Sequence, residues 1–385
     1  MNEQNSAGSI EGRSILVIDD SRLNRAVVKG TLSRMNMRIV EAVDGLEGLA
    51  ALESGRFDLV LVDIVMPRLD GFGFLEKFKA RKGGDFIPVI LMTGSDDLNS
   101  KIKGLTVGAD DFLLKPLNEK ELVARVNSLL RLKVAHDELY EKNMQIQREL
   151  EYAKRLQQYI IPRDFSMIER PVIQGRYLPI ANIGGDLFDC YRLPDGRVGL
   201  VIADVTGHGI PAALVMSMSK TLFSVYAGGY PSTKELLFRV NSEMRGFLMD
   251  THYLTAFYLI YDPHDETIHF TNAGHARPLF YRGRTGKVMA LDTDGLFLGI
   301  SDQDTYGEKA LRVESGDRLI LYTDGITELR STAHEDYGES RLAGFLRRNA
   351  GLEGEAFCDL LLSELDEFAP LAGRADDIAF LSLQF

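Results

Sequence analysis

The stretch Val201-Ile-Ala-Asp-Val-Thr-Gly-His-Gly209 joins a strand-like apolar run to residue types that hold a hard cation. The run from Leu200 to Ala203 predicts a buried strand that ends at Asp204. Two glycines follow in a turn, where the missing side chains let a ligand approach the backbone. A carboxylate at this place is typical of a Mg²⁺ or Mn²⁺ site, although acids after strands also form turns and caps. Further acids placed in the same way distinguish these two interpretations.

Three more acids in the second half of the chain are placed like Asp204. Asp186 ends the glycine-rich segment Gly184-Gly-Asp, Asp324 ends an apolar run, and Asp376 precedes the last apolar run. Four carboxylates without cysteines or paired histidines suit Mg²⁺ or Mn²⁺ better than zinc. Two such ions, about 3.5–4 Å apart, activate a water molecule and clamp a phosphate in known two-metal sites. The four acids therefore predict a binuclear site that hydrolyses phosphate esters.

Polar residues also follow the apolar runs in the first half of the chain. Strand-like and helix-like segments alternate there, which predicts a doubly wound, five-stranded parallel sheet. Ligands bind beyond the carboxyl ends of such strands, and five polar residues are expected at that edge: Asp19, Asp20, Asp63, Thr93 and Lys115. A carboxylate that attacks a phosphoryl group needs a divalent ion and a cationic side chain nearby. This edge is therefore a candidate phosphoryl-transfer site.

Composition limits the classes of partner. The chain has 385 residues, 45% of them hydrophobic, which suffices for two domains and an additional element. Its net charge of -12 lacks the basic footprint of a nucleic-acid or anionic-membrane binder. Two cysteines, no signal-like start and no long apolar stretch predict a cytoplasmic protein without a disulfide scaffold.

A long helical segment is expected between the two halves. No Gly or Pro interrupts the sequence from Asn118, a candidate N-cap, to Pro162. A heptad seam runs along it, with one set at Leu132, Leu139, Ile146, Ala153 and Ile160 and a companion set at Leu129, His136, Asn143, Leu150 and Gln157. We expect a parallel two-stranded coiled coil and hence a homodimer, with Asn143 fixing the register. The alternative is one amphipathic helix packed along its own C-terminal domain, and residues 153–162 are the part best suited to docking there.

Residues 14–132 resemble the response-regulator receiver family. The resemblance implies Asp63 as the phosphoacceptor and a Mg²⁺ ion held by Asp19, Asp20 and Asp63. It further implies that Thr93 and Lys115 contact the phosphoryl group and that Phe112 is the switch aromatic. A cis peptide between Lys115 and Pro116 is a way to aim the ammonium inward. The expected partner is a cognate histidine kinase or a small phosphodonor.

Residues 151–385 resemble the metal-dependent PPM (2C-type) serine/threonine phosphatases, in their SpoIIE-type branch. The resemblance rests on Gly184-Gly-Asp, Asp204-Val-Thr-Gly-His-Gly, Asn272-Ala-Gly-His, Tyr322-Thr-Asp-Gly-Ile-Thr-Glu and Asp376-Asp-Ile, with the lead-in Leu156-Gln157 to Pro162. It implies that two Mg²⁺ or Mn²⁺ ions are held by Asp186, Asp204, the Val205 carbonyl, Asp324 and Asp376. His208 corresponds to a histidine proposed as general acid, although an ordinary loop histidine is an equal interpretation; His275 is expected to be structural.

These resemblances and patterns predict four segments. They are a disordered tail (1–12), an α/β receiver domain (13–132), a helical coiled-coil connector (133–162) and a phosphatase domain of α+β, αββα-layered architecture (163–385). The expected function is a response regulator whose phosphatase acts on a phosphorylated anti-sigma-factor antagonist and is gated by Asp63. The alternatives are a non-catalytic adaptor that grips a partner through the phosphatase-like domain, and a constitutive phosphatase whose receiver serves only localisation.

Overall fold

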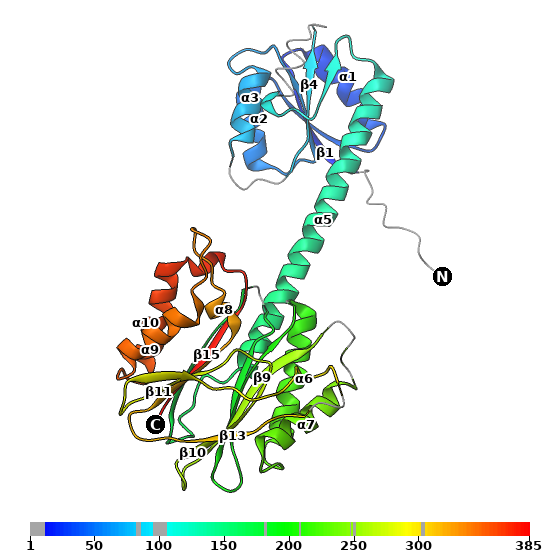
Figure 1. Ribbon diagram of the computed structural model, residues 1–385. Helices are drawn as coiled ribbons and strands as arrows, with labels where there is room; N and C mark the ends of the chain where they lie inside the picture. Colours follow the sequence, from blue (N-terminus) through cyan, green and yellow to red (C-terminus); the bar gives the residue numbers. More distant parts are fainter. Residues whose placement is uncertain are drawn as a thin grey trace. The chain divides into compact units, whose positions relative to one another are not determined.

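The computed structural model of the chain describes residues 12–81, 86–94, 106–180, 183–207, 209–246, 248, 252–301 and 305–385 (Figure 1). The tail expected at residues 1–12 therefore lies almost wholly outside the described residues. The chain divides into two compact units, Met1–Gln147 and Arg148–Phe385. Each unit has its own sheets and its own buried core, and each is described by itself below.

The first unit contains a five-stranded parallel sheet in the order β2-β1-β3-β4-β5. The strands are β1 (Ser14–Ile18), β2 (Arg38–Ala42), β3 (Leu59–Asp63), β4 (Val89–Thr93) and β5 (Asp111–Leu114). Helices α1 (Arg22–Ser33) and α5 (Glu119–Ile160) bury side chains on one face of the sheet, and α2 (Gly45–Ser54) and α3 (Gly71–Lys79) on the other. The doubly wound parallel sheet expected from the sequence is confirmed.

Helix α5 begins in the first unit and ends in the second. Asn118 caps it as expected, because its Oδ1 accepts hydrogen bonds from the backbone N–H groups of Lys120 (2.9 Å) and Glu121 (3.2 Å). The side chains at three seam positions, Leu132, Leu139 and Ile146, are 50%, 60% and 51% exposed. Dimerisation through this seam stays a prediction.

The second unit contains two five-stranded antiparallel sheets in its described part. One has the order β13-β10-β9-β8-β7, with β7 (Leu187–Arg192), β8 (Val198–Val205), β9 (Leu254–Asp262), β10 (Thr267–Ala273) and β13 (Lys309–Arg312). The other has the order β12-β11-β14-β15-β6, with β6 (Val172–Leu178), β11 (Leu279–Arg282), β12 (Lys287–Ala290), β14 (Arg318–Tyr322) and β15 (Ile378–Gln384).

Three buried clusters hold these layers together. The first lies between the two sheets, with Phe257 from one and Leu381 from the other. The second packs the first sheet against α6 (Ile210–Tyr226) and α7 (Thr233–Met244). The third packs the second sheet against α8 (Asp324–Thr327), α9 (Gly338–Asn349) and α10 (Gly354–Phe368), and a short 3₁₀ turn, η1 (Leu371–Gly373), precedes β15. The layers are therefore helix, sheet, sheet, helix, as expected.

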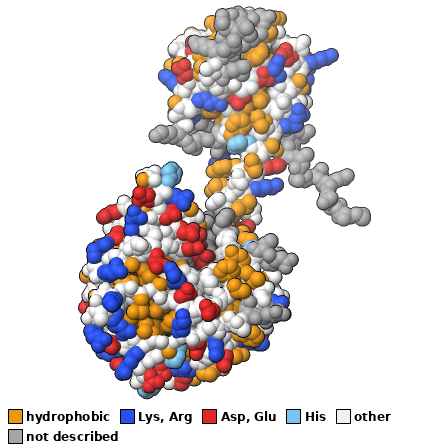
Figure 2. Space-filling view, viewed as in Figure 1, with side chains coloured by type: hydrophobic (Ala, Val, Ile, Leu, Met, Phe, Trp, Pro, Cys, Tyr) orange, Lys and Arg blue, Asp and Glu red, His pale blue; other side chains and the backbone are white. Residues whose placement is uncertain are grey.

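The surface carries charges of both signs. Over the second unit, Lys and Arg are interspersed with Asp and Glu on the face that Figure 2 presents, and hydrophobic side chains gather between them. None of the helices in the described ranges combines the length and the apolar character that crossing a membrane requires.

Candidate functional site

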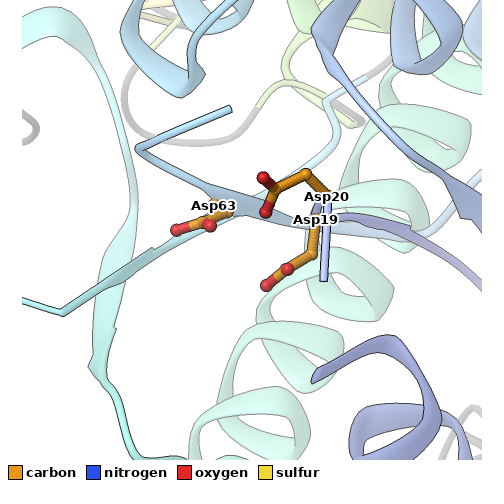
Figure 3. Close-up of side chains that lie close together, drawn as sticks. All are labelled: Asp19, Asp20 and Asp63. Atoms are coloured by element: carbon orange, nitrogen blue, oxygen red, sulfur yellow. The ribbon is translucent and has the colours of Figure 1, made fainter. Parts of the chain in front are cut away.

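Three acids meet at the carboxyl edge of the parallel sheet. Asp19 follows β1 and is fully buried, Asp63 ends β3 and is 6% exposed, and Asp20 is exposed beside them (Figure 3). Each offers a carboxylate oxygen within 4.8 Å of the others. The backbone N–H of Ser21 holds Asp19 in place with a 2.8 Å hydrogen bond to its Oδ1. Three oxygen ligands at this spacing fit a Mg²⁺ ion.

The ammonium group of Lys115 joins two of these acids. Its Nζ lies 2.8 Å from Oδ2 of Asp19 and 2.7 Å from Oδ2 of Asp63. Burial raises the pKa of Asp63, and the Asp19 carboxylate raises it further, whereas Lys115 acts in the opposite direction. Burial by itself lowers the pKa of Lys115, but its hydrogen bonds to both acids raise it overall. The Lys115–Pro116 peptide bond is cis, and the ammonium points at the carboxylates.

The remaining expected receiver residues lie on neighbouring strands. Thr93 is 5% exposed at the end of β4, and its carbonyl oxygen accepts a 2.8 Å hydrogen bond from the Lys115 N–H. Phe112 lies half-buried on β5 with the Arg125 guanidinium 5.4 Å from its ring centroid. Arg125 also binds Asp111, at 2.6 Å, so its side chain links β5 to α5. The structure thus places five of the six expected residues at one edge of the sheet, and Phe112 lies two positions before the end of β5.

The four acids of the second unit come from both of its sheets. Asp204 lies one residue before the end of β8, and Asp186 immediately precedes β7, the neighbouring strand. Asp324 begins α8 just after β14, and Asp376 lies two residues before β15. The ends of these strands meet at one end of the sandwich, where Thr323 binds Asp186 and Asp377 binds Gly185. The acids gathered there are up to 190 positions apart in the chain.

Burial and mutual repulsion raise the pKa values of three of these acids. Burial raises the pKa of Asp186 well above its usual value, and Asp204 and Asp377 raise it further. Burial, followed by Asp324 and Asp376, raises the pKa of Asp204 to about 7. The pKa of Asp324 is raised to about 6 by burial and by Asp376. Carboxylates gathered in this way favour a compensating cation.

The four acids are spread more widely than the receiver acids. Within the ranges that the structure describes, the group of acids whose ligand atoms all lie within 4.8 Å of one another is Asp19, Asp20 and Asp63. A binuclear site distributes its ligands around two ions about 3.5–4 Å apart, so acids on opposite sides lie farther from one another than around one ion. The donor set of the second unit consists of carboxylate oxygens and one backbone carbonyl oxygen, which are the ligands that Mg²⁺ and Mn²⁺ prefer.

Several side chains that the sequence did not single out hold the Gly184-Gly185-Asp186 segment in place. The Thr323 hydroxyl donates a 2.7 Å hydrogen bond to Oδ2 of Asp186. Asp377, which is 4% exposed, accepts a 2.8 Å hydrogen bond from the Gly185 N–H. A side chain at Gly185 would place its Cβ 2.9 Å from the Val205 carbonyl oxygen, the expected backbone ligand. This packing explains why the segment contains glycines.

The sequence led to expectations for two histidines, His208 and His275, and the structure describes only the second. His208, the candidate general acid, lies outside the described residues. His275 is 5% exposed, and its Nδ1 is 2.7 Å from the Thr255 hydroxyl. Burial lowers the pKa of His275 to about 4, so the ring is neutral at physiological pH. These contacts suit the structural part expected for His275.

The fold and the acid cluster of the first unit define a receiver, and family profiles agree. The response regulator receiver domain profile matches residues 15–127, and the profile described as Stage II sporulation protein E (SpoIIE) matches residues 194–385. The chain therefore contains a response regulator receiver domain at residues 15–127 and a SpoIIE-family domain at residues 194–385.

Similar proteins cover the two units separately. The probable transcriptional regulator ycf27 of Cyanophora paradoxa is 41% identical over 122 residues, which are 32% of this chain and 50% of that protein. The chain thus spans about half the length of this curated relative. The SiaA-PP2C domain of Pseudomonas aeruginosa superposes with a TM-score of 0.57 at 23% identity, over 63% of this chain and 98% of that one. The PP2C phosphatase domain of SpoIIE from Bacillus subtilis superposes with a TM-score of 0.50 at 20% identity, over 56% and 63%. These two likenesses concern the fold.

Proposed function

We propose that this protein is a response regulator whose output is metal-dependent dephosphorylation of phosphoserine or phosphothreonine on a protein. The substrate class is a phosphorylated anti-sigma-factor antagonist, which places the chain in a partner-switching circuit. The observation that carries the proposal is the gathering of Asp186, Asp204, Asp324 and Asp376 from two sheets of a SpoIIE-family domain. Their burial and mutual repulsion are unfavourable for a purely structural cluster.

The chain's own residues have separate parts in this chemistry. Asp186, Asp204, Asp324, Asp376 and the Val205 carbonyl are the proposed ligands of two Mg²⁺ or Mn²⁺ ions. Bound there, the ions would supply an activated water and positive charge for the phosphate. Thr323 orients Asp186 through its hydrogen bond. We assign His208 as the general acid for the leaving oxygen, because an imidazole titrates near physiological pH.

The receiver supplies the gate in this proposal. Asp63 accepts a phosphoryl group from a histidine kinase or a small phosphodonor, with Mg²⁺ on Asp19, Asp20 and Asp63. Phosphorylation adds charge beside Lys115, whose two contacts to Asp19 and Asp63 must then rearrange. Helix α5 begins in the receiver unit and ends in the phosphatase unit, so it is the proposed route of the signal.

Release of inorganic phosphate from a phosphoserine protein tests the catalytic part of this proposal. We expect full-length protein to release phosphate with Mn²⁺ and to lose that activity with EDTA or with Asp204→Asn. Asp265→Asn makes the same chemical change at an exposed turn and should leave the rate unchanged. A protein that binds Mn²⁺ and the phosphoprotein without releasing phosphate would favour the adaptor alternative.

A second assay tests the gate. Acetyl phosphate should change the rate of phosphate release by the wild-type protein, and Asp63→Asn should abolish the change. Asp70→Asn is the matched control, because Asp70 caps α3 by accepting a 2.7 Å hydrogen bond from Gly73 and asparagine caps equally well. An equal rate with and without acetyl phosphate would favour a constitutive phosphatase.

A further inference from the structure

The side chain of Gln157, near the end of α5, binds the backbone of Gly184 with both ends of its amide. Its Nε2 donates a 2.7 Å hydrogen bond to the Gly184 carbonyl oxygen, and its Oε1 accepts a 3.1 Å hydrogen bond from the Gly184 N–H. Gln157 is 5% exposed, whereas its neighbour Gln158 is exposed. Gly184 lies two residues before Asp186. The paired contact therefore joins α5 to the segment that carries this proposed metal ligand.

The surroundings of Gly184 leave no room for a side chain. A Cβ at this position would lie 2.1 Å from Oδ2 of Asp377 and 2.3 Å from the Tyr177 hydroxyl. The segment is therefore held at three points: Gln157 binds the backbone of Gly184, Asp377 binds the backbone of Gly185, and Thr323 binds the side chain of Asp186. Since buried backbone groups need partners, loss of the Gln157 amide leaves both polar groups of Gly184 without the partner they have in the structure.

The end of α5 is itself fixed to the core of the second unit. Ile161, which follows the helix, is 5% exposed, and Phe165 is 6% exposed; both belong to the cluster between the two sheets. Gln157 lies one helical turn before Ile161, whose N–H donates to the Gln157 carbonyl oxygen at 3.2 Å. The position of the Gln157 amide therefore follows the position of the last turn of α5.

We propose that Gln157 is a positioning residue that sets the place of Asp186 in the metal site and makes metal affinity depend on the seating of α5. This inference rests on the proposed function. A turn or shift of the end of α5 breaks both hydrogen bonds to Gly184 together, because one rigid amide makes both. The segment then loses one of its three supports, and Asp186 leaves the geometry that the ions need. Groups that orient metal ligands affect affinity about 10–100-fold.

The test measures Mn²⁺ binding by titration calorimetry on the full-length chain. All proteins carry Asp20→Asn and Asp63→Asn, which remove two acids of the receiver site, so that the heat reports on the second unit. Gln157→Met keeps the length and packing of the side chain but removes both hydrogen bonds, and Gln158→Met makes the same change at the exposed neighbour. We expect Mn²⁺ affinity to fall about 10-fold or more in Gln157→Met and to stay unchanged in Gln158→Met.

Two further readouts keep the result decisive. The Gly184 amide should exchange its hydrogen faster in Gln157→Met, and thermal unfolding establishes that each variant is folded. If Gln157→Met does not fold, Gln157→Glu replaces it, because a carboxylate still accepts from the Gly184 N–H but lacks the Nε2 donor; a weaker loss of affinity is then expected.

The outcomes separate this inference from the function on which it rests. Unchanged Mn²⁺ affinity in a folded Gln157 variant, even one that unfolds at a lower temperature, would reduce Gln157 to a structural contact and overturn the inference alone. The protein with only Asp20→Asn and Asp63→Asn should bind Mn²⁺ and lose this binding when Asp204 is also replaced. If it shows no such Asp204-dependent binding, the proposed function is overturned, and the inference with it.

Discussion

The Thr323 hydroxyl donates a 2.7 Å hydrogen bond to Oδ2 of Asp186, across 137 positions of sequence. The hydroxyl oxygen of Thr323 also accepts a 3.0 Å hydrogen bond from the Ala379 N–H. Thr323 is fully buried between β14 and α8. One hydroxyl thus connects β15 to the acid that precedes β7 and joins the two sheets at the end where the four acids lie.

Replacing Thr323 with valine removes this connection while keeping the shape of the side chain. We expect a loss of stability of about 1–3 kcal/mol, because the Asp186 carboxyl and the Ala379 N–H remain buried without the hydroxyl. Calorimetric unfolding in EDTA measures the loss as a lower melting temperature. Thr285→Val, at an exposed turn, is the control and should melt like the wild type. Equal melting of the Thr323 variant would mean that the hydroxyl does not support the fold.

The exposed seam of α5 leads to a prediction about assembly. Leu139 is 60% exposed in the single chain, so a partner helix is expected to cover it. Leu139→Glu should shift the full-length protein from dimer to monomer in sedimentation experiments. Gln145→Glu adds the same charge off the seam and should leave the dimer intact. A wild-type protein that sediments as a monomer would instead favour a helix that packs without a partner copy.

His275 predicts a pH dependence of stability. Burial lowers the pKa of His275 from 6.5 to about 4, so the unfolded chain binds a proton at a higher pH than the folded chain does. Stability is therefore present above the unfolded pKa and is lost as the pH falls from about 6.5 toward 4, by about 3 kcal/mol in all. His275→Asn should flatten that loss, and His264→Asn, in an exposed turn, should not. Identical pH profiles for wild type and His275→Asn would contradict the prediction.

The sequence predicts elements that carry apolar runs, and it misses those defined by pairing. The runs before Asp63 and Asp204 are buried strands in the structure, because each has a paired strand on both sides. Strands β12 and β13 were not expected from the sequence, since most of their residues are exposed. They are strands because they pair at sheet edges with β11 and β10, which depends on residues elsewhere in the chain.

The candidate site also has a part that the sequence predicts and a part that only the fold determines. The acids at strand ends were predictable, because their type and place suit a cation wherever the strands meet. The supporting contacts of Thr323, Asp377 and Gln157 were not, because each depends on a partner at a distance that only the fold determines. Gln157 illustrates the difference: the heptad pattern assigns it to a helix seam, yet its amide is buried against Gly184 of its own unit.

In the function proposed above, the acids of the second unit gather to hold divalent cations. Thermal unfolding of wild type and Asp204→Asn, each in EDTA and in Mn²⁺, tests it most directly. In EDTA, at a pH above 7, we expect Asp204→Asn to melt at the higher temperature, because the change removes a buried carboxylate from the vicinity of Asp324 and Asp376. In Mn²⁺ the order should reverse, since bound ions stabilise the wild type. Equal stabilisation of both proteins by Mn²⁺ would contradict the proposed function. So would a wild-type protein in which Mn²⁺ stabilises only the receiver domain.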